Sequence, residues 1–141
     1  MRFWDTSALI PLLIMERETA RAERWLREDG SVVVWTLARV ELLSALTRRQ
    51  REEPAAARRL QAARRELLTS WERWSEVTAV DLVRQHAERL VEEHPLRAAD
   101  ALQVGAAIVA ADRDPAGLPF VTFDGGQAAA AEREGFRVLG P

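Results

Sequence analysis

The chain alternates short apolar runs with longer segments in which apolar residues recur every three or four positions. Short runs rich in valine, phenylalanine and tryptophan are typical of buried strands, and the longer spacing is typical of amphipathic helices. The predicted strands are residues 2–4, 31–35, 77–80, 118–123 and 136–139. The predicted helices are residues 8–14, 18–28, 37–51, 54–74, 81–93, 97–111 and 125–134.

Hydroxyl residues mark the expected beginnings of two helices. Thr6 or Ser7 is expected to cap the first helix and Thr36 the third, because a hydroxyl can accept a hydrogen bond from a free N–H of the first turn. Strands that alternate with helices need crossover connections, which favours an α/β fold. We therefore predict an α/β/α sandwich around a mostly parallel sheet of about four to five strands. A length of 141 residues fits a single domain over residues 1–141.

The composition narrows the possible chemistry. There is no cysteine, which excludes disulfides, thiolate zinc sites and thiol nucleophiles. All 20 basic residues are arginine, and the absence of lysine excludes a P-loop and Schiff-base chemistry. Only two histidines are present, without a G-x-S-x-G motif, so a serine hydrolase is disfavoured. Carboxylates, hydroxyls and guanidinium groups remain.

Charge and hydropathy also limit the location and partners. The net charge of −2 gives no overall attraction to nucleic acid, so such binding would need local arginine patches. The longest nearly apolar stretch, residues 98–111, contains Asp100 and Gln103 and is too short to span a bilayer. Asp5 stands where the apolar part of a secretory signal would begin. We expect a cytoplasmic protein without membrane contact.

Four carboxylates do not match their surroundings. Asp5 and Asp124 follow predicted strands, at the sheet edge where ligands of parallel sheets bind. Asp100 interrupts an otherwise apolar helix, and burying a carboxylate without a partner is costly. Glu41 belongs to a narrow polar stripe with Arg48 on a mostly apolar helix. If the first strand neighbours the strand before Asp124, these carboxylates meet at one crevice.

Each carboxylate also has a structural interpretation. Asp5 could cap a helix, Asp100 could interact with a helix dipole, and Asp124 could belong to an ordinary Asp-Gly turn. A Glu41–Arg48 pair spans two helical turns and is too long to be tight. Together, four repelling carboxylates without a nearby lysine or histidine indicate a divalent cation. All-oxygen ligands favour Mg²⁺ or Mn²⁺ over zinc.

Five segments together form a recognisable pattern: FWDTSAL at 3–9, VELLSAL at 40–46 followed by Arg48, LRAADALQ at 96–103, FVTFD at 120–124 and GFRVL at 135–139. These segments resemble the PIN domains of VapC-type toxin ribonucleases from bacterial toxin–antitoxin pairs. After Asp124 the chain departs from the family pattern, with Gly125, Gly126 and Gln127 in place of bulkier residues. The resemblance implies a PIN-like fold, Mg²⁺-dependent endonucleolytic cleavage of RNA, a homodimer and a small cognate antitoxin.

The resemblance also suggests individual roles. Asp5 and Asp100 are expected to ligate the metal, directly or through water, while Glu41 and Asp124 complete the catalytic pocket. The expected substrate contacts come from hydroxyl and arginine side chains around that pocket. They are Thr6, Arg48, Arg97 and Thr122. The further arginines of residues 49–65 form either a basic rim for RNA or a solvated helix face.

Two other functions are compatible with parts of the sequence. An aspartyl-nucleophile phosphatase would need a second aspartate where the chain has Ser7, and a lysine that it lacks. A catalytically silent PIN scaffold that only binds a partner would be favoured by loss of a carboxylate, and none of the four is missing. The apolar faces of helices 18–28 and 54–74 predict a homodimer and a groove for an antitoxin segment.

Overall fold

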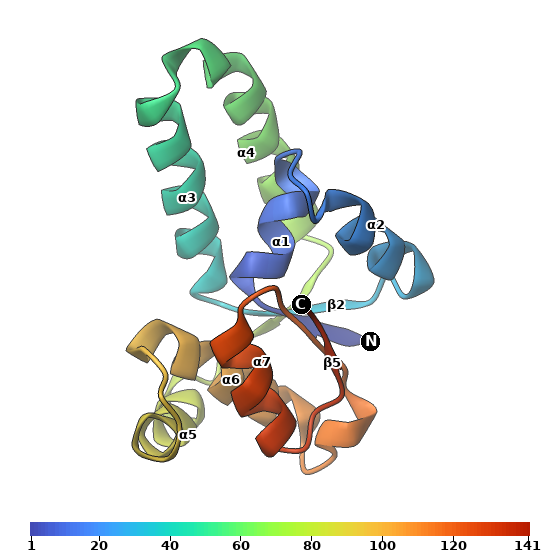
Figure 1. Ribbon diagram of the computed structural model, residues 1–141, viewed down its shortest axis with the longest axis vertical. Helices are drawn as coiled ribbons and strands as arrows, with labels where there is room; N and C mark the ends of the chain where they lie inside the picture. Colours follow the sequence, from blue (N-terminus) through green and yellow to red (C-terminus); the bar gives the residue numbers. More distant parts are fainter.

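A computed structural model describes residues 1–141, built around a sheet of five parallel strands (Figure 1). The order in space is β3-β2-β1-β4-β5, and every neighbouring pair is parallel. This confirms the predicted α/β fold with a mostly parallel sheet. The strands are β1 (Arg2–Trp4), β2 (Val32–Trp35), β3 (Ser75–Val77), β4 (Phe120–Val121) and β5 (Val138–Leu139).

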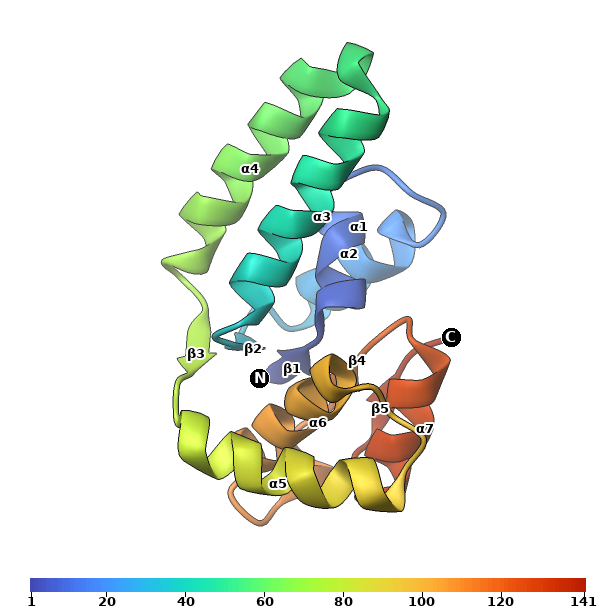
Figure 2. The same cartoon turned by 90° about the vertical axis from the view of Figure 1, so that its left-hand side faces the viewer.

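Helices cover both faces of the sheet. Helices α1 to α4 lie on one face and α5 to α7 on the other, and α3 and α4 extend beyond the sheet as a hairpin (Figures 1 and 2). The helices of the first face are α1 (Thr6–Leu13), α2 (Thr19–Glu28), α3 (Ala38–Glu52) and α4 (Ala57–Trp71). Those of the second are α5 (Val80–Glu93), α6 (Ala98–Ala111) and α7 (Gly125–Arg133). None of them is long and apolar enough to cross a membrane.

The order in which strands are added to the sheet changes direction at β1, so β1 and β4 flank a switch point. From β1 the chain proceeds to β2 and β3 through helices on one face, then returns to pair β4 with the other side of β1. Because parallel crossovers are almost always right-handed, the reversal also places the later helices on the opposite face. Ligands of such sheets bind at this switch point, outside the carboxyl ends of the strands.

The core packs around the two central strands. Phe3 and Trp4 of β1 are fully buried, and all four residues of β2 are buried on both faces. The rings of Phe3 and Phe120 stack with their centroids 5.4 Å apart, which joins β1 to β4. Burying an aromatic side chain contributes on the order of 2–3 kcal/mol, so these residues fix the strand pair that carries Asp5 and Asp124.

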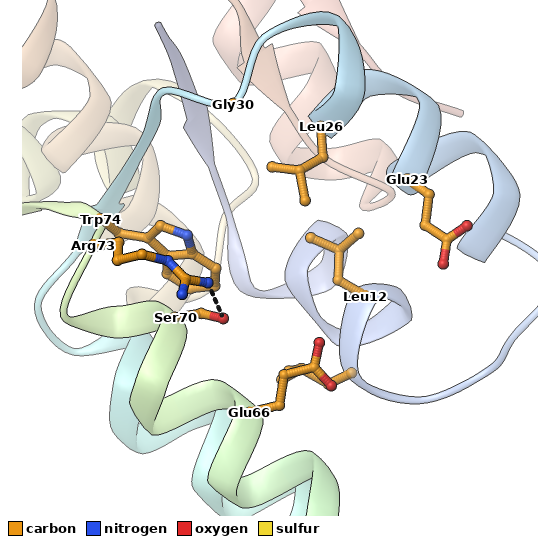
Figure 3. Close-up of a pocket in the computed structure, with 9 residues that line it drawn as sticks. Leu12, Glu23, Leu26, Gly30, Glu66, Ser70, Arg73 and Trp74 are labelled. Carbon is orange, nitrogen blue, oxygen red and sulfur yellow. Dashed lines mark hydrogen bonds between the residues drawn. The ribbon is translucent and has the colours of Figure 1, made fainter.

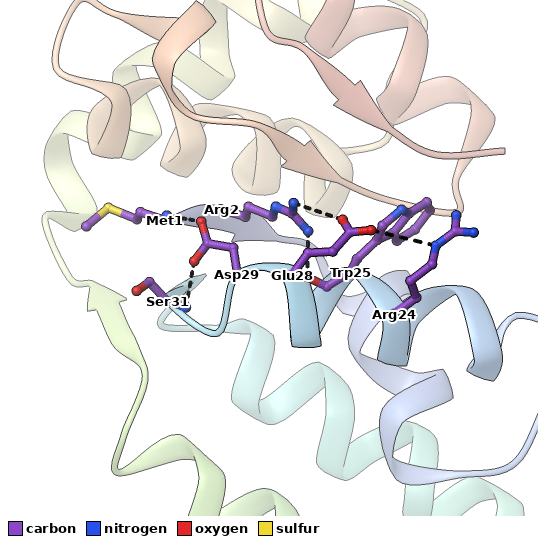
Figure 4. Close-up of polar contacts among 7 residues, drawn as sticks. All are labelled: Met1, Arg2, Arg24, Trp25, Glu28, Asp29 and Ser31. Carbon is purple, nitrogen blue, oxygen red and sulfur yellow. Dashed lines mark hydrogen bonds and ion pairs between the residues drawn. The ribbon is translucent and has the colours of Figure 1, made fainter.

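Polar contacts attach α2 to the first strand (Figure 4). Arg2 contacts Glu28 at 3.1 Å and donates a second hydrogen bond to the carbonyl oxygen of Trp25. Asp29 binds the N-terminal ammonium group, which lowers the pKa of this carboxyl, and accepts a hydrogen bond from Ser31 N at 2.9 Å. These contacts hold β1 at a fixed position against α2.

The predicted helix caps are wrong. The cap of α1 is Asp5, whose side chain accepts from Ala8 N, so the helix begins at Thr6. Helix α3 begins after Leu37 without a side-chain cap. Thr36 instead donates to Glu76 at 2.5 Å, because β2 pairs with β3 and brings the two residues together.

Some predicted elements are also shorter than expected. The helix predicted for residues 54–74 is divided into a 3₁₀ turn (Pro54–Ala56) and α4, because the chain must reverse there to pack α4 against α3. The last two strands contain two residues each, since only these residues keep their ladder partners.

Candidate active site

Asp5 is the most deeply buried carboxylate of the switch point. It follows β1 directly, is 1% exposed, and accepts hydrogen bonds from Ser7 Oγ at 2.8 Å and from Ala8 N at 3.3 Å. Burial raises the pKa of Asp5 to about 7, although hydrogen bonds from Ser7 partly oppose the shift. The capping interpretation of this residue is therefore correct, but a cap alone does not require burial. No arginine pairs with it.

Hydroxyl groups connect Asp5 to the end of β4. Ser7 Oγ accepts a hydrogen bond from Phe123 N at 2.9 Å and lies 3.2 Å from Thr122 Oγ1. Thr122 is fully buried, and its hydroxyl accepts from Asp124 N at 3.0 Å. The Thr122 hydroxyl is thus engaged within the protein. This chain of contacts fixes the distance between the carboxyl ends of β1 and β4.

Glu41 reaches the same region from α3. Thr6 donates to Glu41 Oε2 at 2.9 Å, and Gln103 donates to Thr6 Oγ1 at 2.9 Å. Burial is the largest cause of a raised pKa for Glu41, and the negative charge of Asp100 adds to it. The carboxylates of Glu41 on α3 and Asp100 on α6 are thus close enough for their charges to repel each other.

Asp100 and Asp124 line one cleft. They are half-buried, and the cleft of about 470 Å³ between them is also lined by Arg97 and Gly126. Gln127 donates from its amide to Asp100 Oδ1 at 3.0 Å and from its backbone N–H to Asp124 Oδ1 at 2.7 Å. The expectation that Asp100 is deeply buried is wrong, because it lies in the first turn of α6, where the helix emerges from the core. Asp5 occupies the buried position instead.

The two single arginines of interest line separate clefts. Arg97 precedes α6 and lines the cleft with Asp100. Arg48 lines a second cleft of about 230 Å³ between α1 and α3, which Ser7 also lines. Neither makes an ion pair. Arg49 instead pairs with Glu16, so the arginine-rich segment is only partly available.

Three polar residues of the site are not predicted from the sequence. From the sequence, Ser7 is a candidate helix cap, Gln103 interrupts an apolar helix and Gln127 departs from a family pattern, and none of them is predicted to contact the carboxylates. Each one contacts a carboxylate of the site. A polar residue that is spaced for burial on its helix is the signal that could have identified the two glutamines.

The donor set fits a divalent cation. Asp5, Glu41, Asp100 and Asp124 offer only oxygen atoms, which suit Mg²⁺ or Mn²⁺, and no ion pair neutralises any of them. The side chains whose ligand atoms all lie within 4.8 Å of one another are elsewhere: Glu93, His94 and Glu134. Because the oxygen atoms of the four carboxylates do not form such a close group, water molecules would have to complete the coordination of an ion held among them.

The Glu93, His94 and Glu134 group already has a positive partner. Arg89 donates to Glu134 at 2.8 and 3.0 Å and to Glu93 at 2.5 Å, and these contacts lower the pKa of Glu134. His94 contacts Glu134 at 2.9 Å. Arg89 offsets part of the negative charge of the two glutamates, so this group is an ion-pair network that joins α5 to the end of α7.

The buried carboxylate makes the stability of the metal-free protein depend on pH. Because the pKa of Asp5 is raised, the folded state binds more protons than the unfolded state between pH 4 and 7, and stability falls as the pH rises. Asp5→Asn should remove this loss, since asparagine also caps helices. At pH 8 in chelator we expect the variant to be more stable by up to about 4 kcal/mol in urea unfolding.

The exposed Asp81 supplies a matched control for that measurement. Asp81→Asn should leave the pH dependence of the wild type unchanged, because its carboxylate is solvated in both states. Equal stabilities of the wild type and Asp5→Asn at pH 5 and pH 8 would show that burial does not perturb Asp5.

Comparison with known proteins identifies the family. Residues 2–133 match the model of the PIN domain, so the chain belongs to the PIN domain family. Its fold also resembles that of VapC-type toxins, as the sequence motifs indicated. No curated protein matches it in sequence.

Similar solved structures cover nearly the whole chain. VapC20 of Mycobacterium tuberculosis, described as a Sarcin-Ricin loop cleaving toxin, is 25% identical, with a TM-score of 0.65 and coverage of 100% of both chains. FitAcB from Neisseria gonorrhoeae is 18% identical, with a TM-score of 0.63 over 99% of this chain and 96% of that one. PAE2754 from Pyrobaculum aerophilum is 23% identical, with a TM-score of 0.60 over 97% of this chain and 82% of that one.

Proposed function

We propose that this chain is a metal-dependent endoribonuclease that acts in the cytoplasm as the toxin of a toxin–antitoxin pair. The observation that carries the proposal is a set of carboxylates without positive partners at the switch point of a PIN domain, with Asp5 buried at its centre. Family membership and the likeness to VapC20 support a nuclease. RNA as the substrate and Mg²⁺ or Mn²⁺ as the cofactor are parts of the proposal.

Each residue of the site has a task in this reaction. Asp5 and Asp100 would hold the cation, and Glu41 and Asp124 would complete the acidic pocket. A bound divalent cation supplies a more acidic water and offsets negative charge on the phosphate.

The neighbouring side chains orient these carboxylates and receive the substrate. Thr6 orients Glu41, and Ser7 together with Thr122 orients Asp5. Arg48 and Arg97 line separate clefts beside these carboxylates. They would bind phosphates next to the scissile bond and counteract the repulsion between RNA and the carboxylates.

Cleavage of defined oligonucleotides tests the proposal. The purified chain should cut single-stranded or structured RNA internally in the presence of Mg²⁺ or Mn²⁺, and chelator should stop the reaction. DNA of the same sequence should be cut much more slowly. Absence of cleavage with every RNA and both metals would favour the alternative, a silent PIN scaffold that only binds a protein partner.

A groove beside the predicted helix pair suits an antitoxin segment. Leu12 and Leu13 of α1, Leu26 of α2 and Trp74 after α4 line a cavity of about 430 Å³ (Figure 3). Polar groups at its margin include Glu23, Glu66, Ser70 and Arg73. An apolar floor with a charged margin is typical of a groove that binds an amphipathic helix. We propose that the antitoxin occupies it.

The groove can be tested with the antitoxin that we propose for this chain. Leu26→Arg should weaken its binding at least about tenfold, because burial of one leucine contributes on the order of 2 kcal/mol. Titration of the purified partner measures this affinity. Ala20→Arg makes a matching charge change at an exposed position of the same helix and should bind normally. Equal binding by both variants would exclude the groove.

A different surface suits the homodimer. The apolar faces of α2 and α4 are largely buried within the chain, so they do not form the exposed face that the sequence predicted. Four large apolar side chains that are 44–60% exposed lie instead at the beginnings of α3 and α5, next to the β3 edge. They are Leu37, Val40, Val80 and Leu82. We propose that two chains pair there, and a monomer in sedimentation at micromolar concentration would contradict it.

A further inference from the structure

Gln127 connects two of the carboxylates from a buried position. It lies in the first turn of α7 and is 4% exposed. Its side-chain amide donates to Asp100 Oδ1 at 3.0 Å, and its backbone N–H donates to Asp124 Oδ1 at 2.7 Å. One residue therefore sets the position of a carboxylate on α6 relative to another at the end of β4.

The second polar atom of this side chain has no partner. Gln127 Oε1 is buried without a hydrogen bond. Exchanging the positions of the amide oxygen and nitrogen would not give Oε1 a donor, because Oε1 would then face Asp100 Oδ1 and the two acceptors would repel each other. A buried acceptor without a partner costs free energy that an apolar side chain of the same volume would not. Folding stability therefore does not account for a glutamine at this position.

The backbone around Gln127 is also adapted to the carboxylate of Asp124. Asp124 caps α7, and a Cβ atom at Gly126 would lie 3.3 Å from Asp124 Oδ1, a tight contact. Gly126 lines the cleft, and the absence of a side chain there leaves room for the Asp124 carboxylate in the first turn of α7. The chain's departure from the family pattern at residues 125–127 thus coincides with a specific contact to the site.

We propose that Gln127 is a positioning residue whose amide holds the Asp100 carboxylate in the orientation that binds a divalent cation. The inference rests on the proposed metal site and adds a residue that determines its affinity. Without the amide donor, Asp100 can rotate in its half-open cleft, and cation binding must then restrict it. Partners that orient metal ligands in this way typically change affinity by about 10–100-fold.

Titration of Mn²⁺, with free ion followed by electron paramagnetic resonance, tests the inference without an RNA substrate. Gln127→Met keeps the side-chain volume and removes both amide atoms. We expect its dissociation constant for Mn²⁺ to be about 10–100-fold higher than that of the wild type. Its melting temperature in chelator should be unchanged or higher. Gln61→Met, at an exposed position of α4, should match the wild type in both measurements.

The possible results separate this inference from the proposed function. Wild-type affinity in Gln127→Met, with or without a lower melting temperature, would overturn the positioning role and leave the metal site intact. Failure of the wild-type protein itself to bind Mn²⁺ would overturn both. If Gln127→Met does not fold, Gln127→Leu is measured in the same way, and the same loss of affinity is expected.

Discussion

Asp100→Asn is expected to abolish RNA cleavage while the protein remains folded. Asp100 lines the cleft with Asp124, and its negative charge contributes to the raised pKa of Glu41 on α3. Asparagine keeps an oxygen that can accept from Gln127, so local packing survives, but it lacks the negative charge that a hard cation requires. Loss of a partner that only orients a ligand costs about 10–100-fold, so loss of the ligand itself should cost about 100-fold or more.

The same substitution should not reduce stability. Removing one of several carboxylates reduces the electrostatic repulsion among them in the metal-free protein. The unfolding midpoint of Asp100→Asn in chelator should therefore equal or exceed that of the wild type. Initial rates of RNA cleavage and circular dichroism, measured on one preparation, check both expectations. Asp81→Asn, an exposed change on α5, serves as the control for both. Undiminished cleavage by well-folded Asp100→Asn would remove this residue from the site.

Mn²⁺ or Mg²⁺ is expected to raise the melting temperature of the wild-type protein by about 5–10 °C at saturation. A cation that binds the carboxylates only in the folded protein stabilises the folded state by about 2.7 kcal/mol when its concentration is 100 times its dissociation constant. For a chain of 141 residues this corresponds to the stated rise. The effect should be larger at pH 8 than at pH 6, because the raised pKa of Asp5 means that a proton competes with the cation.

Three controls make the thermal shift specific. Chelator should reverse it, and sodium chloride at matched ionic strength should not reproduce it, because screening acts on all surface charges. Asp5→Asn and Asp100→Asn should show a much smaller rise than the wild type. Identical responses of the wild type and both variants would mean that these carboxylates do not form a metal site. The silent scaffold would then be the better description of this PIN domain.

The sequence by itself determined the class of fold and the residues at the switch point. Short continuous apolar runs and apolar stripes at period 3.6 depend on local geometry, so they predicted the alternation of strands and helices and hence a parallel sheet. The position of Asp5 and Asp124 after strands was enough to place both at the carboxyl edge, and the pairing of β1 with β4 confirms it. Local signals predicted caps and strand lengths less well, because long-range partners such as Glu76 decided them.

Only the tertiary structure decided how the site is held together and which carboxylate is buried. Asp5 is buried, whereas Asp100 is only half-buried. The exposure of Asp100 depends on how α6 emerges from the core, which no local sequence pattern predicts. The contacts of Ser7 with Phe123 and of Gln127 with Asp100 join residues that are 116 and 27 positions apart. A hydrogen bond between side chains needs both partners in place within a few tenths of an ångström. Packing of the whole chain supplies that precision, so the sequence could name the carboxylates but not the residues that position them.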